Sequence, residues 1–227
     1  MDTKKKLCKI GEKMKEAGLV AACDGNISFR NPNGTIVITP SGLPKGELKP
    51  SQLLVMDING KVIKGEGRPS SETPLHLEIY KARPDVNAII HAHPIVATAV
   101  TVAGLAFPST IVTEGAIVLG KSVPTVPYAA PGSAELAKAC AEYAKKVNVF
   151  LMERHGATAL GKDLKEALYR METLEAVAKV YRASLAFAVN SRALQDISRS
   201  RSWHRFSCAS QFRLTYTIQK AVQPIIG

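Results

Sequence analysis

The sequence of 227 residues lacks the features that mark membrane, disulfide-bonded and nucleotide-binding proteins. No apolar run reaches the roughly 20 residues of a membrane-spanning helix, because Pro, Gly or His interrupts each one. The four cysteines form no CxxC pair, so neither a disulfide framework nor a cysteine-based zinc site is expected. No GxGxxG and no Gly-x-x-x-x-Gly-Lys motif opens a helix, and the charged start MDTKKKLCKIGEKM is unlike a signal peptide. We therefore expect a cytoplasmic protein without a membrane partner.

Basic residues outnumber acidic ones, which gives a net charge of +11. Residues 191–227 contribute +5 of this charge, and charges of both signs are mixed over residues 1–190. No basic helix interleaved with aromatic residues is present, so we expect no nucleic-acid partner. A nucleic-acid binder would depend on the tail alone, and its affinity would fall steeply with salt. The basic body is suited to attracting an anionic small substrate.

Helical and strand patterns alternate over residues 1–190, which predicts a single α/β domain followed by an atypical basic tail, 191–227. Ser133 and Asp163 are expected to cap helices, and Asn59-Gly60 is expected to form a type I′ turn. The predicted helices begin near residues 4, 73, 94, 133 and 163. The predicted strands and β-rich regions cover 34–42, 53–63, 86–93, 107–127 and 147–153.

Two histidines, His91 and His93, stand one residue apart at the end of the apolar run AIIHAHP. Residues two apart in a strand share a face, so their imidazoles can converge on one metal ion. His155 ends a second apolar strand, and Gly156 after it would let the backbone bend sharply beside a site. These three histidines are a plausible zinc ligand set, although a strand histidine is commonly just a hydrogen-bonded core residue.

Three turn-like stretches offer glycine, asparagine or serine to an anion. They are DGNIS (24–28), TPSG (39–42) and PSSE (69–72). Free backbone N–H groups and hydroxyls at such turns and helix starts can bind a phosphate. Each stretch alone is most simply a turn or a helix cap, and Glu72 could be an ordinary first-turn acid.

As a set, these motifs resemble the class II aldolase and adducin family, and in particular its L-fuculose-1-phosphate aldolase branch. The stretches GNIS, ITPSG, PSSE, HAHP and RHGATALGKDLKEAL occur in the family's order over roughly residues 5–190. The resemblance implies a three-layer α/β/α fold with a mixed, largely antiparallel sheet, and a homotetramer with sites between subunits. It implies one Zn²⁺ per subunit on His91, His93 and His155, with Glu72 as catalytic acid/base. It places the substrate phosphate among Gly25, Asn26, Ser41, Gly42, Ser70 and Ser71.

The reaction implied by the resemblance is cleavage of a ketose 1-phosphate to dihydroxyacetone phosphate and an aldehyde such as L-lactaldehyde. Zinc would stabilise the enediolate as a Lewis acid, and Glu72 would move the proton at C3. The chain departs from the family in two places. Residues 107–116 (FPSTIVTEGA) lack the branch's tyrosine, so Thr113 or a neighbour would have to serve. The tail is unlike the family's C-terminal segment, although Tyr216 could substitute by position.

Other activities remain open from the sequence. One alternative is a sugar-phosphate 4-epimerase of the L-ribulose-5-phosphate type. That branch has a motif similar to PSSDTPTH, with aspartate where this chain has Glu72. The longer glutamate reaches further towards C3, which favours the aldolase. A methylthioribulose-1-phosphate dehydratase is a third option in the family. A non-catalytic adducin-like interaction module is also possible, but three histidines with Glu72 argue against it, because a scaffold needs no open metal site.

Overall fold

An eight-stranded sheet forms the centre of the computed structural model, which describes residues 2–188. The strand order is β4-β3-β2-β1-β5-β8-β7-β6, and all neighbouring pairs are antiparallel except β6 with β7. The strands are β1 Asn26–Arg30, β2 Ile36–Ile38, β3 Leu54–Met56, β4 Val62–Lys64, β5 Ala88–Ala92, β6 Thr125–Val126, β7 Val149–Met152 and β8 Gly156–Gly161. The predicted tail and Tyr216 lie outside the described residues.

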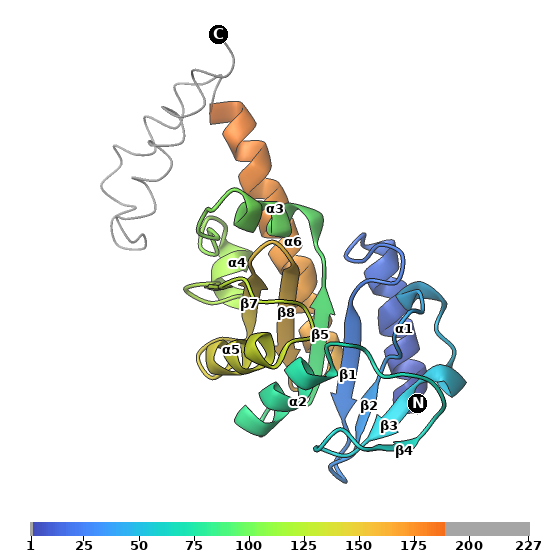
Figure 1. Ribbon diagram of the computed structural model, residues 1–227. Coiled ribbons are helices and arrows are strands. Elements are labelled where there is room, and N and C mark those ends of the chain that lie inside the picture. Colours follow the sequence, from blue (N-terminus) through green and yellow to red (C-terminus); the bar gives the residue numbers. More distant parts are fainter. Residues whose placement is uncertain (1, 189–227) are drawn as a thin grey trace.

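Helices cover both faces of the sheet, with α2 and α5 on one face and α1 and α6 on the other (Figure 1). Each face has its own apolar core. The predicted three-layer α/β/α fold with a mixed, largely antiparallel sheet is therefore confirmed. No helix within residues 2–188 is long and apolar enough to cross a membrane. The helices are α1 Thr3–Glu16, α2 Thr73–Ala82, α3 Ile95–Val102, α4 Thr113–Val118, α5 Ala134–Ala144 and α6 Leu164–Ala188, with short 3-10 turns at Lys45–Glu47 and Pro50–Gln52.

Alternation along the central strands decides which side chains meet α2. In β5, Ile90 belongs to the core under α1 and α6, whereas Ile89 belongs to the core under α2 and α5. Because successive strand residues point to opposite faces, His91 lies on the α2 face with Ile89. In β1, Ile27 points to the α1 face, so Asn26 and Ser28 also face α2. The start of α2 is thus brought against polar residues of β1 and β5.

Helix starts were predicted well where a side chain caps the helix. Ser133 Oγ accepts a hydrogen bond from the Leu136 N–H at 3.1 Å, and Asp163 Oδ1 accepts one from the Glu166 N–H at 2.8 Å. Both predicted caps are confirmed. They could be predicted because a cap pairs residues only three apart in the chain.

Two sequence-based expectations were wrong. Residues 107–127 are not β-rich: they contain the helix α4, a single bridge between Phe107 and Val123, and the two-residue β6. The β-branched residues in this region suggested strands, but packing of α4 against α6 overrides that weak preference. The hairpin at 53–63 does form, although not with a type I′ turn, because only Gly60 has a positive φ (+85°). Asp57 Oδ1 instead accepts from the N–H groups of Asn59 and Lys61 and sets a longer turn.

Candidate active site

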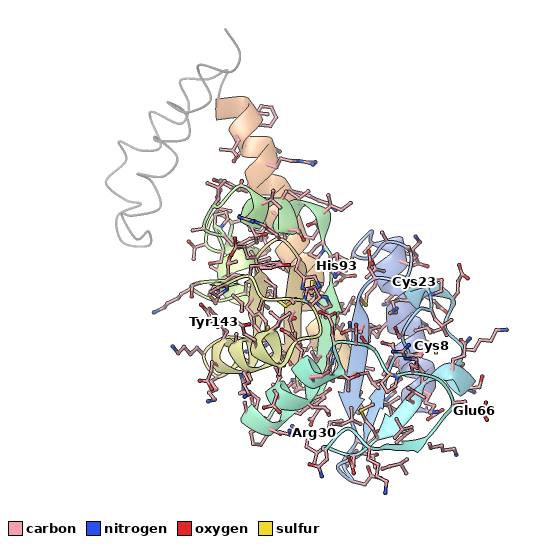
Figure 2. All side chains as sticks on the ribbon, viewed as in Figure 1. Cys8, Cys23, Arg30, Glu66, His93 and Tyr143 are labelled. Carbon is pink, nitrogen blue, oxygen red and sulfur yellow. The ribbon has the colours of Figure 1, made fainter. Side chains whose placement is uncertain are left out.

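Three imidazoles meet where β5 ends and the β7–β8 turn returns. His91 is in β5, His93 follows the strand directly, and His155 precedes β8. The Nε2 atoms of His91 and His93 are 3.0 Å apart, and one ring nitrogen from each of the three histidines lies within 4.8 Å of the others. His93 is labelled in the middle of the molecule in Figure 2. The structure therefore brings the three predicted ligands together.

Within the described residues, His91 alone of the three has a hydrogen bond at its outer ring nitrogen, and the buried His155 Nδ1 has no partner. His91 Nδ1 lies 2.9 Å from the Ala157 carbonyl oxygen, which can only accept, so this nitrogen carries the proton. His91 Nε2 consequently turns a lone pair towards the other two rings. Asp24 Oδ2 lies 3.6 Å from His93 Nδ1 on the outer side. Such partners fix the tautomer and ring orientation of metal-binding histidines.

Glu72, directly before α2, closes the cluster. Its Oε2 is 3.0 Å from His91 Nε2, and its Oε1 is 3.4 Å from His155 Nε2. Asn26 Nδ2 donates to Oε2 at 2.8 Å, whereas the buried Oε1 has no hydrogen-bond donor within the described residues. The carboxylate thus has one oxygen held by the protein and one oxygen directed at the histidines.

The donor set fits a divalent cation. Lone pairs crowded about 3 Å apart repel one another unless a positive charge lies between them. Zinc–nitrogen bonds of about 2.0–2.1 Å in a tetrahedron place ligand atoms roughly 3.3 Å apart. The 3.0 Å between the His91 and His93 nitrogens is close to that spacing, and the Glu72 oxygens lie at similar distances, 3.0 Å from His91 and 3.4 Å from His155. Three histidines could hold the ion, with the orphaned Glu72 Oε1 beside the remaining position.

The pKa shifts of Glu72 and the histidines also suit a cation site. Burial alone would raise the pKa of Glu72, but the neighbouring His91 and His155 and the hydrogen bond donated by Asn26 outweigh burial and hold that pKa well below its usual range. Burial, together with the neighbouring imidazoles, lowers the pKa of His93 to about 4 and also lowers that of His155. These two imidazoles are therefore neutral at pH 7, which is the form that binds metal.

All six residues predicted for a phosphate line one pocket of about 210 Å³ next to Glu72. Gly25 (φ +71°) and Gly42 (φ +74°) have backbone conformations that side chains rarely adopt. A Cβ on Gly25 would also lie 2.7 Å from the His91 carbonyl oxygen. His93 and His155 line the same pocket, so the residues predicted to bind phosphate share one cavity with two of the three histidines.

Asn26 has a different position from the other five. Only 3% of Asn26 is exposed, and its side-chain amide is occupied by Glu72 on one side and His76 on the other. His76, inside α2, has no sequence pattern around it that marks a metal ligand. The signal that could have identified it is its position four residues after Glu72, on the same face of α2.

Sequence reasoning also missed Lys45, which lines the pocket although only 2% of it is exposed. Its Nζ donates to the carbonyl oxygens of Cys23 at 2.8 Å and Leu43 at 2.6 Å. These carbonyls belong to the two loops that carry Gly25 and Gly42, so the ammonium group ties both loops together. No local pattern in the sequence indicates this contact.

One further expectation needs revision. The sharp turn before β8 occurs at Arg154 (φ +55°) rather than Gly156. Gly156 is instead required for close packing, because a Cβ there would collide with the Ala92 carbonyl oxygen and lie 2.7 Å from the His93 ring. Thr113, the expected substitute for the missing tyrosine, is exposed at the start of α4 and does not line the pocket of its own chain.

Comparison with known proteins finds a family, individual relatives and solved structures that this chain resembles. Residues 5–182 match the family described as the class II aldolase and adducin N-terminal domain. The L-fuculose phosphate aldolase of Escherichia coli K12 is 35% identical over 186 residues, which is 81% of this chain and 84% of that protein. The 5-deoxy-D-ribulose 1-phosphate aldolase of a Bacillus thuringiensis strain is 36% identical over 172 residues, covering 75% and 80%.

A solved structure named L-fuculose 1-phosphate aldolase superposes with a TM-score of 0.77 at 33% identity, covering 96% of each chain. The similarity therefore extends across the sheet and helices that build the histidine cluster. This chain belongs to the class II aldolase and adducin family and is an aldolase-type lyase within it.

Proposed function

We propose that this protein is a zinc-dependent aldolase that cleaves a ketose 1-phosphate of the L-fuculose 1-phosphate type. The products are dihydroxyacetone phosphate and an aldehyde such as L-lactaldehyde. The observation that carries the proposal is Glu72, whose carboxylate contacts two of three converging imidazoles at the wall of an anion-suited pocket. Two relatives are named as aldolases of different sugar phosphates. Their names therefore support the class of substrate but do not single out one sugar.

The phosphate end of the substrate is assigned to the pocket formed by Gly25, Ser41, Gly42, Ser70 and Ser71. Serine hydroxyls and glycine backbone N–H groups donate to phosphate oxygens without an arginine. Lys45 adds a positive charge to the same wall by its place between the two glycine loops. With the phosphate in that pocket, the ketose carbons would lie within reach of Glu72.

Glu72 is the proton-transfer group at C3. In the condensation direction, its carboxylate takes a proton from C3 of dihydroxyacetone phosphate and leaves an enediolate. In cleavage, a base from the neighbouring subunit or solvent takes the C4 hydroxyl proton, and the C3–C4 electron pair remains on C3. Glu72, having taken up a proton from solvent, delivers it to C3 and becomes ionised again. The lowered pKa of Glu72 keeps the resting group ionised, as the base role requires.

His91, His93 and His155 would hold the divalent ion, for which we propose zinc. The ion supplies Lewis acidity towards the negative charge that develops as the C3–C4 bond breaks. The imidazoles contribute no net charge when neutral, so the full charge of the ion would act on the substrate. His91 and Ala157 keep the set aligned through the Nδ1–H hydrogen bond.

We further propose a cytoplasmic homotetramer with the aldehyde end of each site completed by a neighbouring subunit. Residues 107–116, where the family branch has its tyrosine, do not line the pocket of their own chain. Exposed apolar side chains on α3 and α4 are suited to subunit contact: Ile95, Val102 and Ile117. Thr113, exposed on α4, would then face the pocket of a partner.

The test is product identification by NMR with zinc-loaded protein and either L-fuculose 1-phosphate or L-ribulose 5-phosphate. We expect dihydroxyacetone phosphate and L-lactaldehyde from the first substrate. Glu72→Gln should lose at least about 100-fold in rate, because it removes the proton-transfer group. The matched control is Glu66→Gln, since Glu66 is exposed and does not line the pocket. Epimerisation of the pentulose without cleavage of either sugar would overturn the proposal in favour of a 4-epimerase.

A further inference from the structure

A buried row of polar side chains runs from Glu72 into the layer between α2 and the sheet. Asn26 and Ser28 lie two apart in β1 and share the face that meets α2. Glu72, His76 and Tyr80 lie four apart, which stacks them on one side of α2. All of these groups except Glu72 are at most 3% exposed, and Glu72 is 7% exposed. Glu72 and Asn26 line the pocket, whereas Ser28, His76 and Tyr80 lie behind it and are not among its lining residues.

The row is continuous at hydrogen-bond distance. Asn26 Nδ2 donates to Glu72 Oε2 at 2.8 Å, and Asn26 Oδ1 lies 2.5 Å from His76 Nε2. His76 Nδ1 lies 2.6 Å from Ser28 Oγ, which lies 2.8 Å from the Tyr80 hydroxyl. At its inner end the Tyr80 hydroxyl reaches the Asn87 carbonyl oxygen at 3.3 Å. A sequence of short contacts therefore links Glu72 to groups deep in the core.

The chemistry of the partners permits one direction of donation. An ionised Glu72 only accepts, so Asn26 must present its N–H group to Glu72 and its carbonyl oxygen to His76. His76 must then carry its proton on Nε2. Burial lowers the pKa of His76 to about 3, so the ring is neutral and Nδ1 is free to accept from Ser28. Because Ser28 donates its proton to His76, the single Tyr80 hydroxyl proton is shared between the nearer Ser28 Oγ and the Asn87 carbonyl oxygen; when Tyr80 donates to Ser28, successive donors are aimed at Glu72.

We propose that His76 is a positioning residue that orients Glu72 through Asn26. Ser28 and Tyr80 fix the tautomer of His76. If the Asn26 amide turned over, its oxygen would face the carboxylate and its N–H group would face the His76 N–H, so both contacts would be repulsive. The row therefore holds Glu72 Oε2 and leaves Oε1 as the oxygen that transfers the proton. This inference rests on the proposed function of Glu72.

A buried polar row could instead serve the core alone. Replacing polar groups by well-packed apolar ones is frequently neutral or stabilising, so core stability gives no reason to keep five polar groups in sequence. Both interpretations predict altered stability when the row is cut. Only the positioning role predicts slower proton transfer at C3 with unchanged substrate binding and metal content.

The experiment follows solvent deuterium entering C3 of dihydroxyacetone phosphate by NMR, with zinc-loaded protein and no aldehyde. This exchange isolates the step assigned to Glu72. For His76→Leu we expect the exchange rate to fall about 10-fold or more, since Asn26 loses its orienting donor. The KM for dihydroxyacetone phosphate should stay within about 3-fold, because the phosphate wall does not contact His76. Zinc content should remain that of the unaltered protein.

Two further variants keep the proposal testable if His76→Leu folds poorly. His76→Gln retains an N–H that can reach Asn26, so it should recover most of the exchange rate. Ser28→Ala is a small change that frees the His76 tautomer, so it should slow exchange by several-fold. The stability control is Met56→Ala in β3, which leaves a cavity in the same core on a strand that β2 separates from β1. It should lower the melting temperature without changing the exchange rate of the folded protein.

Exchange at the unaltered rate in His76→Leu or Ser28→Ala would overturn the positioning role. So would equal slowing in Met56→Ala, because the effect would then follow stability alone. If the unaltered zinc-loaded protein exchanged no deuterium at all, the proposed aldolase function would fail first. The two failures are thereby distinguished.

Discussion

The backbones of β5 and β8 approach so closely beside the histidines that one position there must be glycine. β8 begins so near the end of β5 that a side chain at Gly156 would collide with the Ala92 carbonyl oxygen and the His93 ring. Neither neighbour can yield freely, because Ala92 is paired in the sheet with Ala157 and His93 forms part of the cluster. The position requires glycine for space rather than for a turn.

Gly156→Ala should therefore weaken metal binding. Displacing His93 by a few tenths of an ångström spoils its alignment, and misaligned ligands typically cost 10- to 100-fold in metal affinity. We expect a loss of at least about 10-fold, measured by competition with a chromophoric chelator. Gly34→Ala is the matched control. It strains the backbone at a φ of +83°, but its Cβ would meet nothing within 4 Å, so no neighbour is displaced. Unchanged affinity in Gly156→Ala would contradict this account of the packing.

At the scale of elements, the first turn of α3 is fixed by a buried carboxylate from α6. Glu175, only 4% exposed, accepts hydrogen bonds from the Val96 N–H at 3.1 and 3.2 Å and from the Ala97 N–H at 3.0 Å. α3 starts two residues after His93, and Pro94 before it provides no side-chain cap. Glu175 therefore caps the helix from a distance and steadies the segment that leaves the metal site.

Glu175→Ala should lower the free energy of unfolding by about 2 kcal/mol or more, because two buried N–H groups lose a charged acceptor. Urea unfolding followed by circular dichroism measures this change. Within the described residues, Glu172, one turn earlier on α6, makes no hydrogen bond or ion pair with α3, so Glu172→Ala should change stability by less than about 0.5 kcal/mol. Similar losses in the two variants would show that the carboxylate does not anchor α3.

The sequence could predict elements whose signals are local. Ser133 and Asp163 identify helix starts through contacts three residues away, and the His91–His93 spacing places two imidazoles on one strand face. β8 (GATALG) was missed because it consists of small residues and is buried only by its central place in the sheet. His76 and Lys45 were missed because their partners are 50 and 22 residues away. Such roles depend on the assembled layers rather than on spacing.

At the scale of the whole molecule, the buried imidazoles make stability depend on pH. An unfolded histidine binds a proton near pH 6.5, whereas folded His76 does so only near pH 3. Between these values the unfolded state binds more protons, so the free energy of unfolding falls as the pH falls. His93 and His155 act in the same direction. The lowered pKa of Glu72 acts below the unfolded value of about 4.5, outside this window.

Metal-free protein should therefore lose stability between pH 7.5 and pH 5.5. One such histidine contributes up to about 1.4 kcal/mol per pH unit below 6.5, so His76 alone should account for about 1 kcal/mol. Denaturant unfolding at the two pH values measures the difference. His76→Gln is the control and should show a smaller pH effect. Stability that rises or stays constant towards pH 5.5 would contradict the assignment of neutral buried imidazoles.

The most direct test of the central claim is a titration of metal-free protein with zinc while cleavage of L-fuculose 1-phosphate is measured. If His91, His93 and His155 form the only metal site that the reaction needs, dihydroxyacetone phosphate release should rise with added zinc and level off near one equivalent per chain. Chelation should abolish the activity again. Full cleavage by the metal-free protein, or binding of zinc without any cleavage of sugar phosphates, would contradict the account.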